Sequence, residues 1–145
     1  MFQKLVLVAL FCMCLVGCAS VPMGDAKQDA ALKSFASKPD VAGIYIYRNE
    51  TMGATVRMDV AVDGKPLGQT AANTYLYTEV PPGSHVMTSA AENTSELTID
   101  AAAGKLYYVW QEVKMGIIYA RNKLSLVDEA TGQKGVKETN LAATK

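Results

Sequence analysis

The strongest constraint on the fold is an alternation of apolar and polar side chains that ends in a tight-turn signal. From Thr55 to Val62 (TVRMDVAV) every second residue is apolar, which places one face of a strand in a core and leaves the other in water. Asp63 and Gly64 follow at once. Because both central residues of a type I′ turn need a positive φ angle, this pair strongly indicates a β-hairpin.

Short runs of the same kind recur beyond Val41. They are rich in tyrosine, valine, isoleucine and threonine, and glycine, proline and asparagine residues that favour turns separate them. The predicted strands are residues 43–48, 55–62, 67–70, 73–80, 84–90, 96–100, 105–113 and 123–127. The run over residues 105–113 is apolar on both faces, which indicates an interior position in a sheet.

Seven or eight short strands at regular spacing are typical of a β-sandwich or a partly open barrel. We predict an all-β fold, an antiparallel β-sandwich over residues 41–130, with a short C-terminal helix beginning at Asp128-Glu129 and a tail over residues 131–145. A chain of 145 residues is long enough for one domain with a sizeable core and too short for two.

The start of the chain has the composition of an export signal. Lys4 supplies the positive charge, and Leu5 to Val16 (LVLVALFCMCLV) is an apolar run of 12 residues, shorter than the roughly 20 that span a bilayer. The run closes on Leu15-Val16-Gly17-Cys18. This sequence resembles the lipobox of bacterial lipoproteins, in which an apolar residue, a small or apolar residue and a glycine or alanine precede the cysteine. The resemblance implies a signal peptide over residues 1–17 that is cleaved before Cys18.

The lipobox resemblance also implies how the protein is held in the cell. In lipoproteins the cysteine thiol carries diacylglycerol and the freed amine is often acylated, so Cys18 is the expected lipidation site. Two or three acyl chains hold a protein firmly to a bilayer, whereas one chain binds reversibly. Membrane lipid, reached through acylated Cys18, is therefore the first expected partner. In enteric-type bacteria, an aspartate directly after the cysteine changes the sorting of a lipoprotein. The residue here is Ala19, so the resemblance implies sorting to the outer membrane, and we expect the domain on its periplasmic side.

Small and polar residues fill the segment between the cysteine and the first strand. Ala19 to Asp40 contains proline and glycine breakers and no alternating pattern, so residues 18–40 are predicted to form the lipidated cysteine and a flexible tether. Asp29 to Ala36 can form two helical turns that bury Leu32 and Phe35, but so short a helix is marginal without a docking surface.

Charge and cysteine content argue against several functions. The chain has 14 basic and 14 acidic residues, and loss of Lys4 with the leader leaves 13 against 14, a formal charge of −1. We therefore expect no nucleic-acid partner. The three cysteines are Cys12, Cys14 and Cys18, of which only Cys18 stays in the mature chain. A single thiol argues against disulfides, redox chemistry and a cysteine-ligated metal, and no cofactor is expected.

Several strand and turn motifs resemble known envelope domains. Val60 to Thr70 (VAVDGKPLGQT) and Val80 to Val86 (VPPGSHV) resemble PEGA-type and transthyretin-like β-domains. Together with Tyr45 to Arg48 and Gly104 to Val109 (GKLYYV), they resemble small proteobacterial lipoproteins that carry the domain of unknown function 2846, over about residues 42–127. The resemblance implies a β-sandwich in a lipidated envelope protein, and it brings no catalytic residue.

The residues that could support chemistry are few and scattered. His85 is the only histidine, and no second histidine or mature cysteine could complete a metal site with it, so no metal ligand is predicted. We expect His85 to bond a backbone group near its turn. No spacing singles out a catalytic pair of carboxylates, so no catalytic residue is predicted among Asp59, Asp63, Glu79, Glu92, Glu96 and Asp100.

Tyrosines at alternate positions are the one feature above background. If Ile44, Ile46 and Leu76 face the core, the tyrosines beside them face outward together and form an aromatic strip that could stack on sugar rings or bind a protein. The candidate ligand-binding residues are Tyr45, Tyr47, Tyr75, Tyr77 and Tyr107. The alternative is structural, because tyrosine favours strands and cross-strand aromatic pairs stabilise sheets.

Three functions remain open from the sequence. The preferred hypothesis is a lipid-anchored, non-catalytic binding or scaffolding domain of the cell envelope, with an envelope protein or glycan as its partner. The first alternative is an enzyme, or an enzyme accessory, that acts on envelope polymers. The second is a purely structural lipoprotein.

Overall fold

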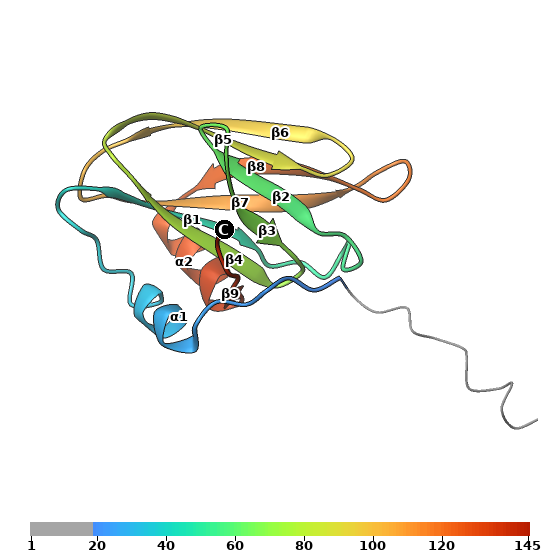
Figure 1. The fold of residues 1–145 in the computed structure, drawn as a ribbon, viewed down its shortest axis with the longest axis horizontal. Helices are drawn as coiled ribbons and strands as arrows, with labels where there is room; N and C mark the ends of the chain where they lie inside the picture. The colour runs from blue at the N-terminus through green and yellow to red at the C-terminus, as the bar shows by residue number, and fades with distance from the viewer. Residues whose placement is uncertain (1–18) are drawn as a thin grey trace, which may run out of the picture.

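A computed structural model describes residues 19–145, which form two packed β-sheets and two short helices (Figure 1). The elements are α1 (Ala26–Leu32), β1 (Ala42–Arg48), β2 (Met58–Val62), β3 (Lys65–Thr70), β4 (Thr74–Val80), β5 (Gly83–Ala90), β6 (Thr94–Ala101), β7 (Leu106–Met115), β8 (Ala120–Val127), α2 (Glu129–Lys137) and β9 (Asn140–Leu141). Each of the eight predicted strands corresponds to one of β1 to β8.

The turn chemistry read from the sequence is confirmed in the β2–β3 hairpin. Asp63 and Gly64 have φ angles of 50° and 77°, the left-handed values that a type I′ turn needs. Residues 114–122, which lie between two predicted strands, are the end of β7, a tight turn and the start of β8. The β7–β8 hairpin is therefore longer than the sequence indicated.

The two sheets correct one part of the predicted fold. The four-stranded sheet has the order β3-β2-β5-β6 and is antiparallel throughout. The five-stranded sheet has the order β8-β7-β1-β4-β9 and is mixed, because β1 runs parallel to β7 and β4 runs parallel to β9. A mainly β, sandwich-like fold is confirmed, but an entirely antiparallel sandwich is wrong. Alternation of side chains fixes which face of a strand is buried and carries no information about the direction of its neighbour.

Aliphatic side chains from both sheets form the core between them. Ile44, Ile46 and Leu76 are fully buried there, as predicted, together with Val60, Met87 and other residues of the facing sheet. Strand β1 is buried along its whole length because it lies in the middle of the larger sheet and is covered on both faces.

The helices cover the outer face of the five-stranded sheet, on the side away from β5 and β6 (Figure 1). Helix α2 begins where the sequence predicted, with the Asp128 carboxylate accepting a hydrogen bond from the Thr131 amide. Its Gly132 and Gly135 lie against the rings of Tyr108 and Tyr47 so closely that a Cβ atom would collide with them. These glycines allow the helix to pack onto an aromatic layer.

The segment predicted to be a flexible tether is packed against the domain in the described residues. Gly24 donates its amide to Leu141 O at 2.8 Å, and Lys33 Nζ donates to Thr139 O at 2.6 Å. Helix α1 finds in the tyrosine-rich sheet face the docking surface that so short a helix requires. The tether prediction is therefore wrong from Ala19 onward.

The C-terminal residues also belong to the fold rather than to a free tail. Strand β9 pairs with β4, and the Lys145 amide donates to Leu67 O at 2.9 Å. Neither helix in the described part of the chain is long and apolar enough to cross a membrane.

Candidate functional site

Four of the five predicted tyrosines gather on one face of the larger sheet. The antiparallel register places Tyr45 beside Tyr77 and Tyr47 beside Tyr75. The ring of Tyr45 is central, with centroid distances of 4.7 Å to Tyr77 and 6.1 Å to Tyr75. On its other side it stacks on Tyr108 at 5.3 Å and an interplanar angle of 16°. We call Tyr45, Tyr47, Tyr75, Tyr77 and Tyr108 the tyrosine layer.

The tyrosine layer is not the exposed strip that the sequence suggested. Tyr45, Tyr47 and Tyr75 are 1%, 2% and 0% exposed, and only Tyr77 is half-buried. Phe35 packs on Tyr45 at a centroid distance of 5.5 Å, and helix α2 covers Tyr47. The prediction of an outward strip is wrong because the residues before β1 and after β8 supply a third layer that covers it.

Tyr107, the fifth predicted residue, lies on the opposite face. In the parallel register Ile44 is beside Tyr107 and Tyr45 is beside Tyr108, so Tyr107 packs against the core between the sheets. Its hydroxyl accepts from the Ala102 amide at 2.8 Å. Tyr108, rather than Tyr107, belongs to the tyrosine layer. Which of the two tyrosines joins the layer depends on the direction and register of β7 relative to β1, and the sequence does not show these.

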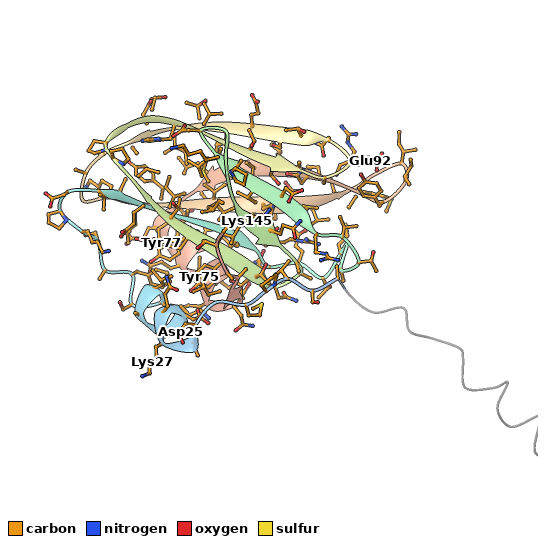
Figure 2. All side chains as sticks on the ribbon, viewed as in Figure 1. Asp25, Lys27, Tyr75, Tyr77, Glu92 and Lys145 are labelled. Carbon is orange, nitrogen blue, oxygen red and sulfur yellow. The ribbon has the colours of Figure 1, made fainter. Side chains whose placement is uncertain are left out.

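The buried hydroxyl groups of the layer are bonded to the covering elements. Tyr45 Oη donates to Leu32 O at 2.7 Å, and Tyr75 Oη donates to Asp29 Oδ1 at 2.6 Å, both in helix α1. Figure 2 shows Tyr75 and Tyr77 between strand β4 and this helix. Burial raises the pKa of Tyr47 to about 12 and also raises the pKa values of Tyr45 and Tyr75. All three phenols therefore stay protonated, and those of Tyr45 and Tyr75 act as donors.

One part of the tyrosine layer remains accessible, at a groove between α1 and β4. This groove, which we call the α1 groove, has a volume of about 420 Å³, and Leu32, Ser34, Lys38, Tyr77 and Glu79 are among its lining residues. Lys38 Nζ lies 2.9 Å from Glu79 Oε2, to which Tyr77 Oη donates at the same distance. The hydrogen bond from Lys38 lowers the pKa of Glu79. The groove thus combines an aromatic ring with a cation, a carboxylate and a hydroxyl group.

A second groove, of about 430 Å³, surrounds His85 and Asp63 at the edge between the sheets. His85 Nδ1 lies 2.6 Å from Asp63 Oδ2, and Nε2 lies 2.7 Å from Pro81 O. Asp63 Oδ1 also accepts from the Val86 amide at 2.9 Å. The bond to a backbone carbonyl beside the turn agrees with the structural role expected for His85. Because both ring nitrogens are engaged, His85 has no free nitrogen for a general base or a metal ion.

Acidic, histidine and cysteine side chains of residues 19–145 form no group of three or more that could hold a metal ion. Four of the six acidic residues considered in the sequence, Asp59, Asp63, Glu79 and Glu92, have local partners. Glu92 accepts three backbone amides of the β7–β8 turn, and Asp59 Oδ1 accepts from Gln69 Nε2 at 2.9 Å.

Arg48 is a buried cation that no sequence pattern predicted. It is 0% exposed, and its guanidinium donates to Val56 O and Gly53 O, each at 2.7 Å. Burial lowers the pKa of Arg48, while Glu50 opposes that effect. The side chain fixes the loop between β1 and β2, whose Ala54 carbonyl accepts the Ala19 amide at 2.8 Å. Cys18 itself lies outside the described residues.

Comparison with known proteins assigns the chain to a family. Residues 38–123 match the family described as "Protein of unknown function (DUF2846)", which is more than half of the 145-residue chain. The chain belongs to this family. The resemblance to the domain of unknown function 2846 is therefore confirmed.

The DUF2846 match begins just before β1 and ends inside β8, so α1, α2 and β9 lie outside it. The covering layer of this DUF2846 protein is thus contributed by residues on both sides of the matched region. An uncharacterized protein of Haemophilus influenzae (strain ATCC 51907 / DSM 11121 / KW20 / Rd) is 30% identical over 132 residues, which are 90% of this chain and 79% of that protein. No solved structure matches the chain.

Proposed function

We propose that this DUF2846 protein is a lipid-anchored protein of the bacterial cell envelope whose β-domain acts by binding or scaffolding rather than by catalysis. The observation that carries the proposal is the sequence Leu15-Val16-Gly17-Cys18 at the end of a 12-residue apolar run. Acylation of Cys18 would hold the protein to a bilayer, with the periplasmic face of the outer membrane as the proposed location.

The packing of Ala19 limits how far the domain can move from that anchor. Its amide is bonded to Ala54 O, and Val21 is 8% exposed. A chain that docks one residue after the acylated cysteine keeps the domain next to the lipid. This favours a role at the membrane surface over one that needs a long reach.

Contact rather than catalysis is supported by the state of the polar groups. His85 is occupied at both nitrogens, and the carboxylates Glu92 and Asp63 hold backbone amides in place. The α1 groove is the proposed contact surface, because it offers part of an aromatic ring beside charged and hydroxyl groups that can hydrogen-bond to an envelope protein or a glycan.

Metabolic labelling with a clickable palmitate analogue tests the anchor. We expect label on the wild-type protein and none on Cys18→Ser, which should also keep its leader. The matched control is Cys14→Ser, which removes a thiol from the same apolar run and should leave labelling unchanged. Equal labelling of Cys18→Ser and the wild type would contradict the proposal.

Photo-crosslinking in intact cells tests the contact surface. A photoreactive amino acid at Ser34, on the rim of the α1 groove, should yield an adduct with one envelope protein or glycan. The control position is Glu96, which is exposed on the edge strand β6 and should yield none. The same adducts from both positions, or none from Ser34, would rule out the α1 groove as the contact surface.

A further inference from the structure

The turn between β7 and β8 exposes more apolar surface than any other part of the described chain. Met115, Ile117 and Ile118 are 85%, 91% and 83% exposed, and Tyr119 is 53% exposed. The other exposed large apolar side chains in residues 19–145 are between 38% and 54% exposed. Four such residues within five positions form a contiguous apolar tip, which we call the hairpin tip, and such patches mark interaction sites.

The hairpin tip is held in place by Glu92. Its carboxylate accepts the backbone amides of Ile117, Ile118 and Tyr119 at 3.0, 3.2 and 3.2 Å, and the Glu92 amide donates to Ala120 O at 2.9 Å. Gly116 lies so close to the Glu92 carboxylate that a Cβ atom would collide with it. Figure 2 shows Glu92 beside this turn. The backbone amides are thus satisfied within the protein, and the apolar side chains remain in solvent.

Basic residues stand directly behind the hairpin tip. Lys114 on β7 and Arg121 on β8 are paired in the register, and both are exposed. Lys114 Nζ also lies 3.2 Å from Glu112 Oε1. This arrangement suits a bilayer interface. The apolar side chains of the tip can enter the boundary of the acyl chains, the tyrosine can lie at the level of the headgroups, and the cations behind them can reach the lipid phosphates.

The chain enters the domain close to the base of the same hairpin. The Ala19 amide donates to Ala54 O in the loop between β1 and β2. Gly53 of that loop packs against β7, where a Cβ atom on Gly53 would lie 3.0 Å from Val113 Cγ1. Glu50 Oε2 also accepts the Val113 amide at 3.0 Å. Met52 in this loop is 54% exposed. Figure 1 shows the start of the described chain and the β7–β8 turn toward the same end of the molecule's long axis, with α1 toward the other.

We propose that the hairpin tip inserts into the interface of the bilayer that carries the acyl chains of Cys18, with Lys114 and Arg121 at the lipid phosphates. This inference rests on the proposed lipidation of Cys18. Two attachment points at one end of the molecule fix its orientation, so that the α1 groove faces away from the membrane. The tip lies next to the chain end that leads to the lipid and carries cations directly behind its apolar side chains, which favours a lipid surface over a protein partner.

Fluorescence of the full-length lipoprotein, expressed, purified in detergent and reconstituted into vesicles of phosphatidylethanolamine and phosphatidylglycerol, tests the insertion. An environment-sensitive dye on Ile118→Cys should emit at shorter wavelength when the lipoprotein is in vesicles than when the protein without its acyl chains is in detergent-free buffer. Spin-labelled lipid in the vesicles should quench the emission of this dye. The same dye on Lys27→Cys, an exposed position on α1, should show neither change. The dye on Met115→Cys should show the same shift to shorter wavelength in vesicles. The added substitutions I117S and I118S should abolish this shift, while the protein still floats with the vesicles.

The outcomes separate this inference from the lipid anchor. Protein that floats with the vesicles while the dye at position 118 stays water-like keeps the anchor and overturns the inserted tip. Protein without acyl mass on Cys18 that does not float overturns both. A dye that shifts only in native envelope vesicles, and not in pure lipid, identifies a protein partner for the tip and overturns the bilayer contact.

Discussion

His85 links two turns because both of its ring nitrogens face acceptors. An imidazole can donate at Nδ1 to Asp63 and at Nε2 to Pro81 O only when both nitrogens carry protons, so the folded state favours the charged ring. The hydrogen bond with Asp63 is the main cause that raises the pKa of His85 above 6.5, and the bond from His85 is the main cause that lowers the pKa of Asp63 below 3.8. The pair couples the β2–β3 turn to the start of β5.

This coupling predicts a pH-dependent stability. Because the folded-state pKa of His85 is raised, its contribution is complete below pH 6.5, the ordinary value for histidine, and is lost as the pH rises through the folded-state value. The unfolding temperatures of the wild type and His85→Gln should therefore differ most between pH 5 and 6 and least near pH 8.5, which is above the range in which most histidines titrate. Lys123→Gln, an exposed control, should follow the wild type throughout. A difference that stays constant with pH would contradict the charged pair.

Helix α2 contains two glycines, Gly132 and Gly135, which lower its intrinsic helix propensity. By propensity alone they weaken the helix, because glycine is about 1 kcal/mol less favourable than alanine in a helix interior. In the structure both are buried, Gly132 against Tyr108 and Gly135 against Tyr47. The close approach of the helix backbone to the tyrosine layer is possible only without side chains there.

Gly135→Ala should therefore destabilise the protein although alanine is the better helix former. A Cβ atom on Gly135 would collide with three atoms of the Tyr47 ring, so the overpacking cost should lie in the upper part of the usual range of about 1–3 kcal/mol. After a propensity gain of about 1 kcal/mol, the free energy of unfolding should fall by about 1–2 kcal/mol. Chemical denaturation followed by Trp110 fluorescence measures the change. Lys134→Ala, exposed on the same helix, should stay within about 0.5 kcal/mol of the wild type. A stabilised Gly135→Ala variant would show that the packing against Tyr47 is loose.

The elements differ in how far local sequence determines them. The Asp63-Gly64 hairpin, strand β1 and the start of α2 at Asp128 follow from residues within each segment, and all three are found as predicted. The position of Tyr107, the packing of α1 and the burial of Tyr45 depend on pairings between distant segments. Alternation correctly separated Ile44 and Ile46 from the tyrosines, but it could not show that two flanking helices would cover the second face.

The whole molecule has three layers, and the third holds the tyrosine layer out of water. The four-stranded sheet and the five-stranded sheet enclose an aliphatic core, and the five-stranded sheet and the helices α1 and α2 enclose an aromatic one. On an uncovered sheet the tyrosine rings would form an exposed apolar patch prone to association. In the folded protein they are buried, and the hydroxyl groups of Tyr45 and Tyr75 donate hydrogen bonds to helix α1. The residues on either side of the DUF2846 match thus complete its fold.

Deleting residues 129–145 should abolish the cooperative folded state, because it removes α2 from the covering layer and β9 from the edge of the five-stranded sheet. Helix α2 lies against Tyr47 and Tyr108. An aromatic side chain buries about 150–250 Å², so uncovering about half of that on each of these two tyrosines costs roughly 5 kcal/mol at about 25 cal/mol per Å². Loss of the pairing between β4 and β9 adds to that cost, and the whole stability of a typical domain is only about 5–15 kcal/mol.

Thermal unfolding and tyrosine nitration measure the outcome, and the control is deletion of Thr144 and Lys145, both exposed, which removes the bond to Leu67 and should leave cooperative unfolding intact. A shortened chain that still unfolds cooperatively with Tyr47 protected from nitration would mean that the two sheets alone determine the fold, and that the covering layer has another role.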